Sequence, residues 1–411
     1  MSVADPMHCR SCAGDRLLAV LSLGQTPLAN SLLTEGQLDL PEPRYPLDLV
    51  FCPTCSLVQI TETVPPEILF GDYLYLSSFS DTMLASAREI SRRTIEDHGL
   101  DDDSLVVEVA SNDGYLLQYY REAGVPVLGI EPAANIAEIA KKERGVPTLC
   151  EFFGEAVAHR LVSEGTRADV IHANNVLAHV ADLNGFVSGI ACLLKRDGVA
   201  IIEVPHVEVM VDRCEFDTIY HEHLCYFSLT ALRNLFERHG LRIVDVERLP
   251  LHGGSLRVFA GYGSRASRAP TEVLDRESRR GLDRVDFYQG FAQRVRDLKT
   301  SLSRLLIGLK HEKSRLAAYG AAAKGSTLLN FTGTGREILD FVVDRSPHKQ
   351  GLYMPGVHLP IHSPDKLLEE QPDYVLLLTW NFADEIMNQQ AEYRRRGGQF
   401  IVPVPAPAIV G

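Results

Sequence analysis

The stretch Leu105–Tyr120, LVVEVASNDGYLLQYY, constrains the fold of this chain more than any other. Apolar residues surround Glu108, which predicts a buried strand. Small and turn-forming residues run from Ala110 to Gly114, and apolar residues then return at helical spacing. A strand, a tight turn and a helix N-terminus in this order let backbone N–H groups approach a ligand closely. We therefore expect a ligand-binding turn in an α/β sheet, with an ordinary strand-to-helix turn as the alternative.

The next expected strand, 125–130, ends in Glu131. An acid at the end of the second strand of such a sheet can accept hydrogen bonds from the two hydroxyls of a ribose. The turn and the acid together resemble those of S-adenosylmethionine-dependent methyltransferases. The chain has no GxGxxG motif, which argues against a dinucleotide. The resemblance implies that the methyl donor is bound by Glu108, Ala110, Asn112, Gly114 and Glu131.

Length and charge narrow the class of protein. A chain of 411 residues is long enough for two or three domains. It has 41 basic and 54 acidic residues, a net charge of −13, which argues against nucleic-acid binding through a general attraction for phosphates. The N-terminus lacks a basic region followed by an apolar run, and no stretch of about 18 apolar residues occurs. We expect a soluble, cytoplasmic protein that binds neither nucleic acid nor membranes.

Four of the eight cysteines form two Cys-x-x-Cys pairs. Two such pairs can close a tetrahedral zinc site without an open position for a substrate, so we expect a structural Zn²⁺ rather than four free thiols. The metal would stabilise a segment of about 60 residues that is too short to build its own core. A zinc ribbon that binds nucleic acid is disfavoured, because residues 13–75 contain only Arg16 and Arg44 as basic side chains. The expected ligands are Cys9, Cys12, Cys52 and Cys55.

Aromatic and small polar residues alternate in the segment 70–80. Such a segment can be a linker packed by its aromatic rings or a lid over a cleft. If it is a lid, Tyr73 and Tyr75 are its candidate substrate contacts.

After Glu131 the chain keeps alternating between strand and helix patterns, which predicts a doubly wound, mostly parallel sheet. Ligands of such sheets bind at the carboxyl ends of the strands. By resemblance, Phe152 would lie beside the adenine of the donor. Asn174 could reach the donor's amino-acid portion, and His179 would face the acceptor, with packing or helix capping as the alternatives. The expected strands are 146–149, 168–173 and 198–203, and the expected helices are 133–144, 154–164 and 183–194.

The sequence YHEH, Tyr220–His223, gathers groups that can transfer protons or polarise an oxygen. It differs from the helical metal motif HExxH, because a separation of two places the histidines on opposite sides of a helix or on one face of a strand. We prefer acid–base chemistry to a catalytic metal or to structural histidines.

The cysteine pairs, the donor turn, the YHEH sequence and the run LHGGSLR at 251–257 together resemble the sugar C-methyltransferases of deoxysugar biosynthesis. The resemblance spans nearly the whole chain. It implies an N-terminal zinc-binding domain, a central Rossmann-like methyltransferase domain and a C-terminal domain, with S-adenosylmethionine and Zn²⁺ as cofactors. The implied substrate is a nucleotide-diphosphate keto sugar, with a thymidine-diphosphate (dTDP) sugar as the expected form.

In such an enzyme His223 would remove the C3 proton of a 4-keto sugar. Tyr220 and His179 would hold the keto oxygen as negative charge develops on it. Glu222 would orient His223 or bind a sugar substituent, and His221 is a candidate substrate contact. Methylation of another keto metabolite, or of oxygen or nitrogen, is the alternative within the class. The alternative from another class is a zinc-ribbon binding protein with an inactive core.

A second α/β unit begins at Arg315, after helices rich in Arg, Glu and Leu. Its first strand ends in Gly320, and a run of small residues then leads into a helix, a composition typical of a phosphate site. The resemblance implies that Lys324, Ser326 and Thr327 contact the pyrophosphate, whereas an oligomerisation domain is the alternative. Strands at 338–343 and 374–379 would complete a second Rossmann-like sheet. The expected domains are 1–75, 76–263, the helical connector 264–314 and 315–411.

Overall fold

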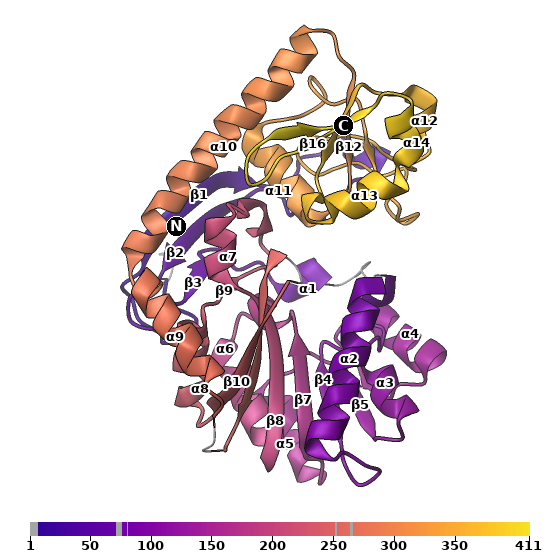
Figure 1. Ribbon diagram of the computed structural model, residues 1–411. Helices are drawn as coiled ribbons and strands as arrows, with labels where there is room; N and C mark the ends of the chain where they lie inside the picture. Colours follow the sequence, from indigo (N-terminus) through magenta and orange to yellow (C-terminus); the bar gives the residue numbers. More distant parts are fainter. Residues whose placement is uncertain (1–6, 71–75, 80, 251–252, 264–265) are drawn as a thin grey trace.

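The computed structural model describes residues 7–70, 76–79, 81–250, 253–263 and 266–411 (Figure 1). It contains sheets of four, seven and six strands. In Figure 1 the seven-stranded sheet and the six-stranded sheet lie at opposite ends of the molecule, and a long helix, α10, runs along one side. The fold class expected from the sequence, a four-cysteine module followed by two Rossmann-like sheets, is confirmed.

The N-terminal module, residues 7–70, is a small antiparallel sheet. Its own strands are β1 (Leu18–Thr26), β2 (Tyr45–Phe51) and β3 (Val58–Ile60). One cysteine pair precedes β1 and the other lies between β2 and β3, so the sheet brings the two pairs together. The fourth strand, β9 (Cys225–Tyr226), comes from a distant part of the chain and pairs with β3. The module therefore incorporates the residues that directly follow the YHEH sequence.

The central sheet has the strand order β10-β11-β8-β7-β4-β5-β6. Strands β4 to β8 are parallel, and β10 and β11 add an antiparallel hairpin at one edge. From β4 the chain adds β5 and β6 on one side of that strand, and then β7 and β8 on the other. The strand order therefore changes direction beside β4, which is where open α/β sheets bind ligands. The strands are β4 (Val106–Val109), β5 (Val127–Ile130), β6 (Thr148–Leu149), β7 (Ala168–Asn174), β8 (Leu194–Pro205), β10 (Arg242–Leu249) and β11 (Ser255–Gly261).

Helices cover both faces of this sheet, which explains why its central strands β4, β5 and β7 are largely buried. The sequence-based boundaries differ by a few residues. The strand expected from Val146 begins only at Thr148, because the Val146 N–H bonds to the Ala140 carbonyl and Pro147 has no N–H to donate. The helices of this part are α2 (Asp81–His98), α3 (Leu117–Glu122), α4 (Ala134–Arg144), α5 (Glu155–Ser163), α6 (Leu183–Leu193), α7 (Val207–Asp212) and α8 (Leu229–Arg238).

The C-terminal part of the chain from β12 to β17, called here the C-terminal domain, has the strand order β14-β13-β12-β15-β16-β17, in which only β17 is antiparallel to its neighbour. The expected second Rossmann-like sheet is thus present, with shorter strands than the sequence suggested. Its strands are β12 (Leu316–Tyr319), β13 (Val342–Val343), β14 (Ile361–His362), β15 (Tyr374–Leu377), β16 (Gln399–Val402) and β17 (Ala408–Val410), and its helices are α11 (Ala323–Thr332), α12 (Lys366–Glu370), α13 (Ala383–Gln389) and α14 (Ala391–Arg395).

Two helices, α9 (Ala269–Arg280) and α10 (Val285–His311), join the central and C-terminal sheets. Helix α10 has 27 residues and buries an apolar stripe that packs on β1, α7 and α11. Tyr288 of this stripe lies against Phe51 of the N-terminal module, with 5.0 Å between the ring centroids. One helix therefore packs against all three parts of the molecule. Over the described residues, no helix combines the length and the apolar character needed to cross a membrane.

Candidate active site

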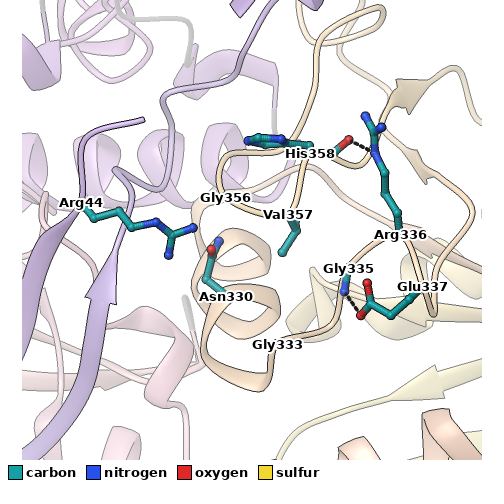
Figure 2. Close-up of a pocket in the computed structure, with 9 residues that line it drawn as sticks. All are labelled: Arg44, Asn330, Gly333, Gly335, Arg336, Glu337, Gly356, Val357 and His358. Atoms are coloured by element: carbon teal, nitrogen blue, oxygen red, sulfur yellow. Dashed lines mark hydrogen bonds between the residues drawn. The ribbon is translucent and has the colours of Figure 1, made fainter. Parts of the chain in front are cut away.

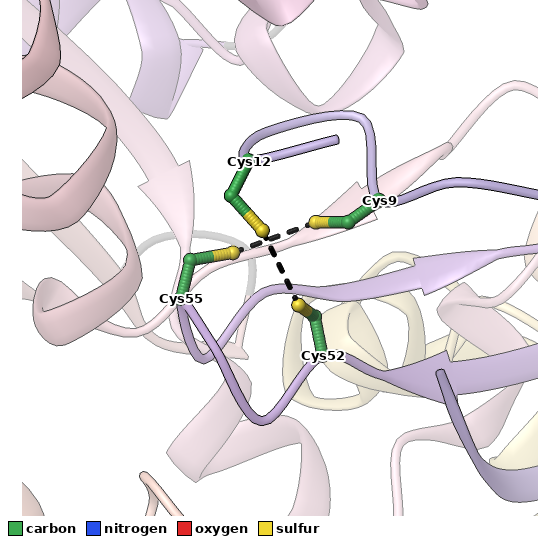
Figure 3. Close-up of side chains that lie close together, drawn as sticks. All are labelled: Cys9, Cys12, Cys52 and Cys55. Atoms are coloured by element: carbon green, nitrogen blue, oxygen red, sulfur yellow. Dashed lines mark hydrogen bonds between the residues drawn. The ribbon is translucent and has the colours of Figure 1, made fainter. Parts of the chain in front are cut away.

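The four cysteine sulfurs converge in the N-terminal module (Figure 3). All four Sγ atoms lie within 4.8 Å of one another, and the closest pairs are Cys9–Cys55 at 3.4 Å and Cys12–Cys52 at 3.5 Å. A tetrahedral zinc ion with Zn–S bonds of about 2.3 Å places its ligands ~3.8 Å apart, which these positions fit. The hydrogen bond between the sulfurs of Cys9 and Cys55 lowers the pKa of Cys9 and raises the pKa of Cys55, so one proton is shared and one sulfur of the pair is readily a thiolate. Elsewhere in the described ranges, no other set of three or more metal-ligating side chains occurs.

The turn after β4 has an unusual backbone. Ala110, Asn112 and Gly114 have φ angles of 54°, 49° and 77°, in the left-handed region that ordinary residues avoid. At Gly114 a side chain would also be crowded, because a Cβ would lie only 3.0 Å from Val146 Cγ2. This backbone turns sharply and leaves small side chains at the carboxyl end of the sheet. A backbone of this shape can approach a ligand closely, and the binding of the methyl donor at this turn stays a prediction.

Glu131, at the end of β5, is fixed by the turn. Its Oε2 accepts the Asn112 N–H at 3.0 Å, and its Oε1 accepts the Ala133 N–H at 2.9 Å. Burial raises the pKa of Glu131, and these two hydrogen bonds oppose that rise. The carboxylate therefore stands rigidly beside the turn, at the position from which it can hold a ribose.

Glu108 is buried in β4, and the burial, with the charges of Asp113, Glu131 and Glu203, raises its pKa well above the ordinary value. Its Oε2 accepts no hydrogen bond from the residues that the structure describes. A buried acceptor of this kind suits a cationic group of a ligand, since a positive charge would favour the ionised carboxylate.

The remaining donor-site candidates lie around the same edge. Asn174 ends β7, and its Oδ1 has no hydrogen-bond partner within the described part of the chain. Phe152 is 50 % exposed, so its ring is open to a flat ligand. The Ser77 N–H donates to Asn112 Oδ1 at 2.9 Å and ties the segment before α2 to the turn. Tyr73 and Tyr75, expected in the lid, lie outside the described residues.

Residues 220–223 form a turn, called here the YHEH turn, between the short helix η4 (Phe216–Thr218) and β9. Neither the helix nor the strand that the spacing of His221 and His223 suggested is present here. The turn sends its side chains in different directions. His221 Nε2 donates to the Pro46 carbonyl at 3.1 Å, and Glu222 Oε1 accepts the Asn30 amide at 2.6 Å. Pro46 and Asn30 both belong to the N-terminal module. His221 is therefore directed at that module and does not form one site with His223.

Tyr220 and His223 form a hydrogen-bonded pair. His223 Nδ1 lies 2.8 Å from the Thr218 carbonyl, which can only accept, so Nδ1 carries the proton. In the neutral form of the ring, His223 Nε2 therefore presents its lone pair and accepts the Tyr220 hydroxyl at 2.9 Å. The His179 ring stands edge-on to His223 with 4.7 Å between centroids, and burial lowers the pKa of His179 to about 4. The His223 imidazole, the Tyr220 phenol and a second imidazole, which burial keeps neutral, are thus grouped together.

Lys324, in the first turn of α11, faces the segment that precedes the YHEH turn. Its charge lowers the pKa of Glu215 and of Asp217, although burial has the larger effect and raises the pKa of Glu215 to about 7. The ammonium also lies 5.0 Å from the centroid of the Trp380 ring. The other two residues expected at the pyrophosphate, Ser326 and Thr327, are buried in α11. The structure places this helix N-terminus at the junction with the active-site segment.

Two residues beside the turn after β12 were not singled out from the sequence. Asp344 Oδ2 accepts the Ala321 N–H at 2.7 Å and its Oδ1 accepts the Ser346 N–H at 2.8 Å, the same pattern that Glu131 makes in the central domain. Lys349 Nζ donates to the Ala321 carbonyl at 2.8 Å, and its charge lowers the pKa of Glu222. Asp344 could have been found from the sequence, because it is an acid at the end of the second strand of its sheet. No local pattern pointed to Lys349.

A separate cavity of about 460 Å³ lies between the N-terminal module and the far end of α11 (Figure 2). Arg44 extends toward Asn330 on one side, and His358 lines the other, with its Nε2 3.3 Å from Glu42 Oε2. Lys324 lies eight residues, about 12 Å of helix, before Thr332 at this end of α11. The cavity is therefore distinct from the site around the YHEH turn.

Comparison with known proteins shows the class of protein to which the chain belongs. Models of known families match three successive parts of the chain: a zinc binding domain over residues 9–70, a methyltransferase domain over 85–246 and a C-methyltransferase C-terminal domain over 250–405. The C-methyltransferase NovU of Streptomyces niveus is 38 % identical over 406 residues, which cover 98 % of this chain and 96 % of that protein. The chain therefore belongs to this family of C-methyltransferases.

Other similarities cover only part of the chain. The ubiquinone biosynthesis O-methyltransferase of Bartonella quintana is 23 % identical over 152 residues, 34 % of this chain and 61 % of that protein. The solved structure of magnesium protoporphyrin IX methyltransferase from Synechocystis PCC 6803 with bound SAH has a TM-score of 0.35 and 15 % identity, over 47 % of this chain and 90 % of that one. Similarity of this degree says nothing about the substrate.

The predictions of an enzyme, of the family and of both cofactors are confirmed. The protein is an S-adenosylmethionine-dependent C-methyltransferase with a four-cysteine zinc site. The roles of individual residues stay predictions.

Proposed function

We propose that the enzyme methylates a carbon next to the ketone of a nucleotide-linked 4-keto-deoxysugar, with C3 as the acceptor atom. The observation that carries this proposal is the pair Tyr220–His223, in which Thr218 fixes the tautomer and leaves the Nε2 lone pair as a proton acceptor. Carbon is a poor nucleophile, so a C-methyltransferase needs such a base. The division into residues 1–75, 76–263, 264–314 and 315–411 is part of the proposal.

The chemistry begins with the C3–H bond of the sugar. As substrate binds, the Tyr220 hydroxyl turns from His223 Nε2 to the keto oxygen. His223 Nε2 then takes the C3 proton, and the electron pair of the broken C–H bond forms an enolate. Tyr220 and the neutral ring of His179 stabilise the charge on its oxygen. When bound, the donor would supply an electrophilic methyl group on a cationic sulfur, which would pass to the C3 carbon while the sulfur keeps the bonding pair.

The donor would occupy the edge of the central sheet. Glu131 would accept the ribose hydroxyls, and Phe152 would lie along the adenine. Glu108 and Asn174 would receive the amino-acid portion, because each has a buried oxygen that accepts no bond from the described residues. Ala110, Asn112 and Gly114 supply the close backbone approach.

The C-terminal domain would hold the nucleotide diphosphate of a dTDP-type sugar. It repeats the Rossmann-like arrangement, and its Asp344 repeats the backbone contacts of Glu131. The first turn of α11 would contact the pyrophosphate through N–H groups and through Lys324, Ser326 and Thr327. The remaining candidate contacts with the sugar are Glu222, His221, Tyr73 and Tyr75.

Incubation with a dTDP-4-keto-6-deoxy sugar and S-adenosylmethionine in deuterium oxide tests the proposal. We expect the C3 proton to be lost and a methyl group to appear on that carbon, as read by NMR and mass spectrometry. A methylated product that keeps the C3 proton would mean that another atom is the acceptor, and the role of His223 would fall. Absence of turnover, with donor binding intact, would direct the search to other keto substrates.

A further inference from the structure

The N-terminal module is joined to the YHEH turn by a strand pairing. Val58 of β3 pairs with Tyr226 of β9, and Gln59 pairs with Cys225. Val58 lies three residues after the zinc ligand Cys55, and Tyr226 lies three residues after His223. The metal centre and the proposed base are therefore linked through two very short lengths of chain and a ladder of backbone hydrogen bonds.

Side chains add to this pairing on the turn itself. His221 Nε2 bonds to the Pro46 carbonyl, and Asn30 Nδ2 donates to Glu222 Oε1 at 2.6 Å. Glu222 is only 5 % exposed, whereas Asn30 lies at the surface of the module. The Asn30 amide is the only hydrogen-bond donor that the described residues direct at the Glu222 side chain. A short bond to a buried carboxylate is among the stronger hydrogen bonds in proteins.

Glu222 is also influenced by the C-terminal domain. Burial raises its pKa to about 7, and the Asn30 bond and then the charge of Lys349 oppose this rise. These are the two groups that face the carboxyl, while His179 bonds to the Glu222 backbone. One side chain of the YHEH turn is thus hydrogen-bonded to the N-terminal module and is also influenced by a charge of the C-terminal domain.

We propose that Asn30 is a positioning residue for methyl transfer: by holding Glu222, it fixes the YHEH turn so that Tyr220 and His223 face the sugar. The inference rests on the function proposed above. It gives the N-terminal module a second task, since the module supports the reacting groups as well as its own fold. Loss of the amide leaves the buried Glu222 without its donor, so the carboxyl holds its proton to higher pH and the turn loses an anchor.

The test compares Asn30→Ala with Asn184→Ala. Asn184 is a matched control, because its amide also bridges to the N-terminal module, donating to the carbonyls of Arg10 and Ser11 at 3.0 Å, but it lies in α6 and makes its other bond to His239 rather than to the YHEH turn. The readouts are kcat and KM against pH, binding of S-adenosylhomocysteine by calorimetry, and titration of Glu222 by NMR on carboxyl-labelled protein, with Glu222→Gln assigning the signal.

We expect Asn30→Ala to lower kcat about tenfold or more, the usual weight of a hydrogen bond to a charged group, with unchanged affinity for S-adenosylhomocysteine. The Glu222 titration and the pH profile should shift to higher pH. Asn30→Gln, which keeps the amide, should recover part of the loss, and Asn184→Ala should lower stability without moving either pH curve.

A Glu222 titration that is the same in Asn30→Ala and wild type overturns the inference, whatever the substrate proves to be. A shifted titration without any change in kcat also overturns it, because Asn30 would then tune the charge of Glu222 and not the reaction. Failure of the wild-type enzyme to methylate a keto sugar counts against the proposed function alone. In that case the readout used instead of kcat is the position of the Tyr220 and His223 signals in the NMR spectrum. Asn30→Ala should shift these signals, and Asn184→Ala should not.

Discussion

The indole N–H of Trp380 donates a hydrogen bond to Oδ2 of Asp217, with 2.6 Å between the two atoms. Trp380 follows β15 in the C-terminal domain, and Asp217 lies in η4, three residues before Tyr220. Asp217 is fully buried, and burial raises its pKa while Lys324 and Trp380 oppose the rise. The segment that carries the proposed base is therefore held by the C-terminal domain as well as by the N-terminal module.

Replacement of Trp380 by Phe should weaken this connection. The variant removes the donor to a buried carboxyl, so we expect a loss of about 1.5–3 kcal/mol in the free energy of unfolding. Urea titration followed by circular dichroism measures it, since Trp380 is the single tryptophan of the chain and its fluorescence disappears with it. Phe382→Leu, at an exposed neighbouring ring, is the control, and equal stability of the two variants would contradict the prediction.

His223→Asn should nearly abolish turnover. General base catalysis contributes about 10²- to 10⁴-fold, and we expect a rate loss in this range with unchanged affinity for S-adenosylhomocysteine. Tyr220→Phe should be impaired as well, because the enolate oxygen loses a donor. Turnover assays and calorimetry separate rate from binding. His311→Asn, at the exposed end of α10, is the control, and a normal rate in His223→Asn would exclude this residue as the base.

Glu131→Gln should weaken donor binding. In the variant an NH₂ group replaces one carboxylate oxygen and meets the backbone N–H that donates to this oxygen in the wild type. The turn therefore loses an acceptor, and the ribose would lose one as well. We expect the dissociation constant of S-adenosylhomocysteine to rise about tenfold or more. Glu138→Gln, on the exposed face of α4, should bind normally. Wild-type affinity in Glu131→Gln would remove this acid from the donor site.

The stability of the protein should depend on the protonation of Glu215. Burial raises the pKa of this carboxyl from 4.5 to about 7. The folded protein then holds the proton more tightly than the unfolded chain, so this stabilisation is complete below pH ~4.5 and is lost as the pH rises through about 7. Glu215→Gln mimics the protonated form. Its free energy of unfolding should therefore exceed that of wild type by an amount that grows between pH 5 and pH 8, up to about 3 kcal/mol.

Denaturant titrations at pH 5, 6.5 and 8 would measure this difference. Glu237→Gln, at an exposed position of α8, should follow the wild-type curve at each pH. Parallel curves for Glu215→Gln and wild type would show that Lys324 and Arg213 compensate the burial of the carboxylate completely.

Cys9→Ser should lose zinc and stability together. The four sulfurs form one closed set, and removal of a thiolate leaves the metal with three ligands. We expect one zinc per chain in wild type by elemental mass spectrometry, and a substoichiometric amount with a lower melting temperature in the variant. Cys150→Ser, at an exposed cysteine outside the cluster, should keep both properties. A stable, zinc-free Cys9→Ser protein would argue against a structural role for the metal.

The parts of the site that the sequence predicted depend on short-range patterns. The cysteine spacing, the turn from Ala110 to Gly114 and the acid at Glu131 are all properties of a few consecutive residues or of a regular alternation of strand and helix. The arrangement of these elements follows from general rules of α/β sheets.

The parts that were not predicted depend on contacts between distant segments. Asn30 and Glu222 are 192 residues apart, and Asp217 and Trp380 are 163 residues apart. No local pattern encodes such pairs, because they arise only when three domains pack together. The YHEH turn shows the same limit, since its form follows from partners in the N-terminal module and in η4 rather than from its own sequence.

The strand pairing between β3 and β9 has a consequence for the recombination of such enzymes. The N-terminal module is contiguous in the gene up to about residue 70, and a crossover between relatives just beyond it would look like an exchange of an independent unit. Such an exchange would give the β9 strand of one parent to the β3 strand of the other, and would also mix Asn30 with a foreign Glu222. Functional chimeras should therefore arise only when both segments, the first 70 residues and residues 216–227, are inherited from the same parent.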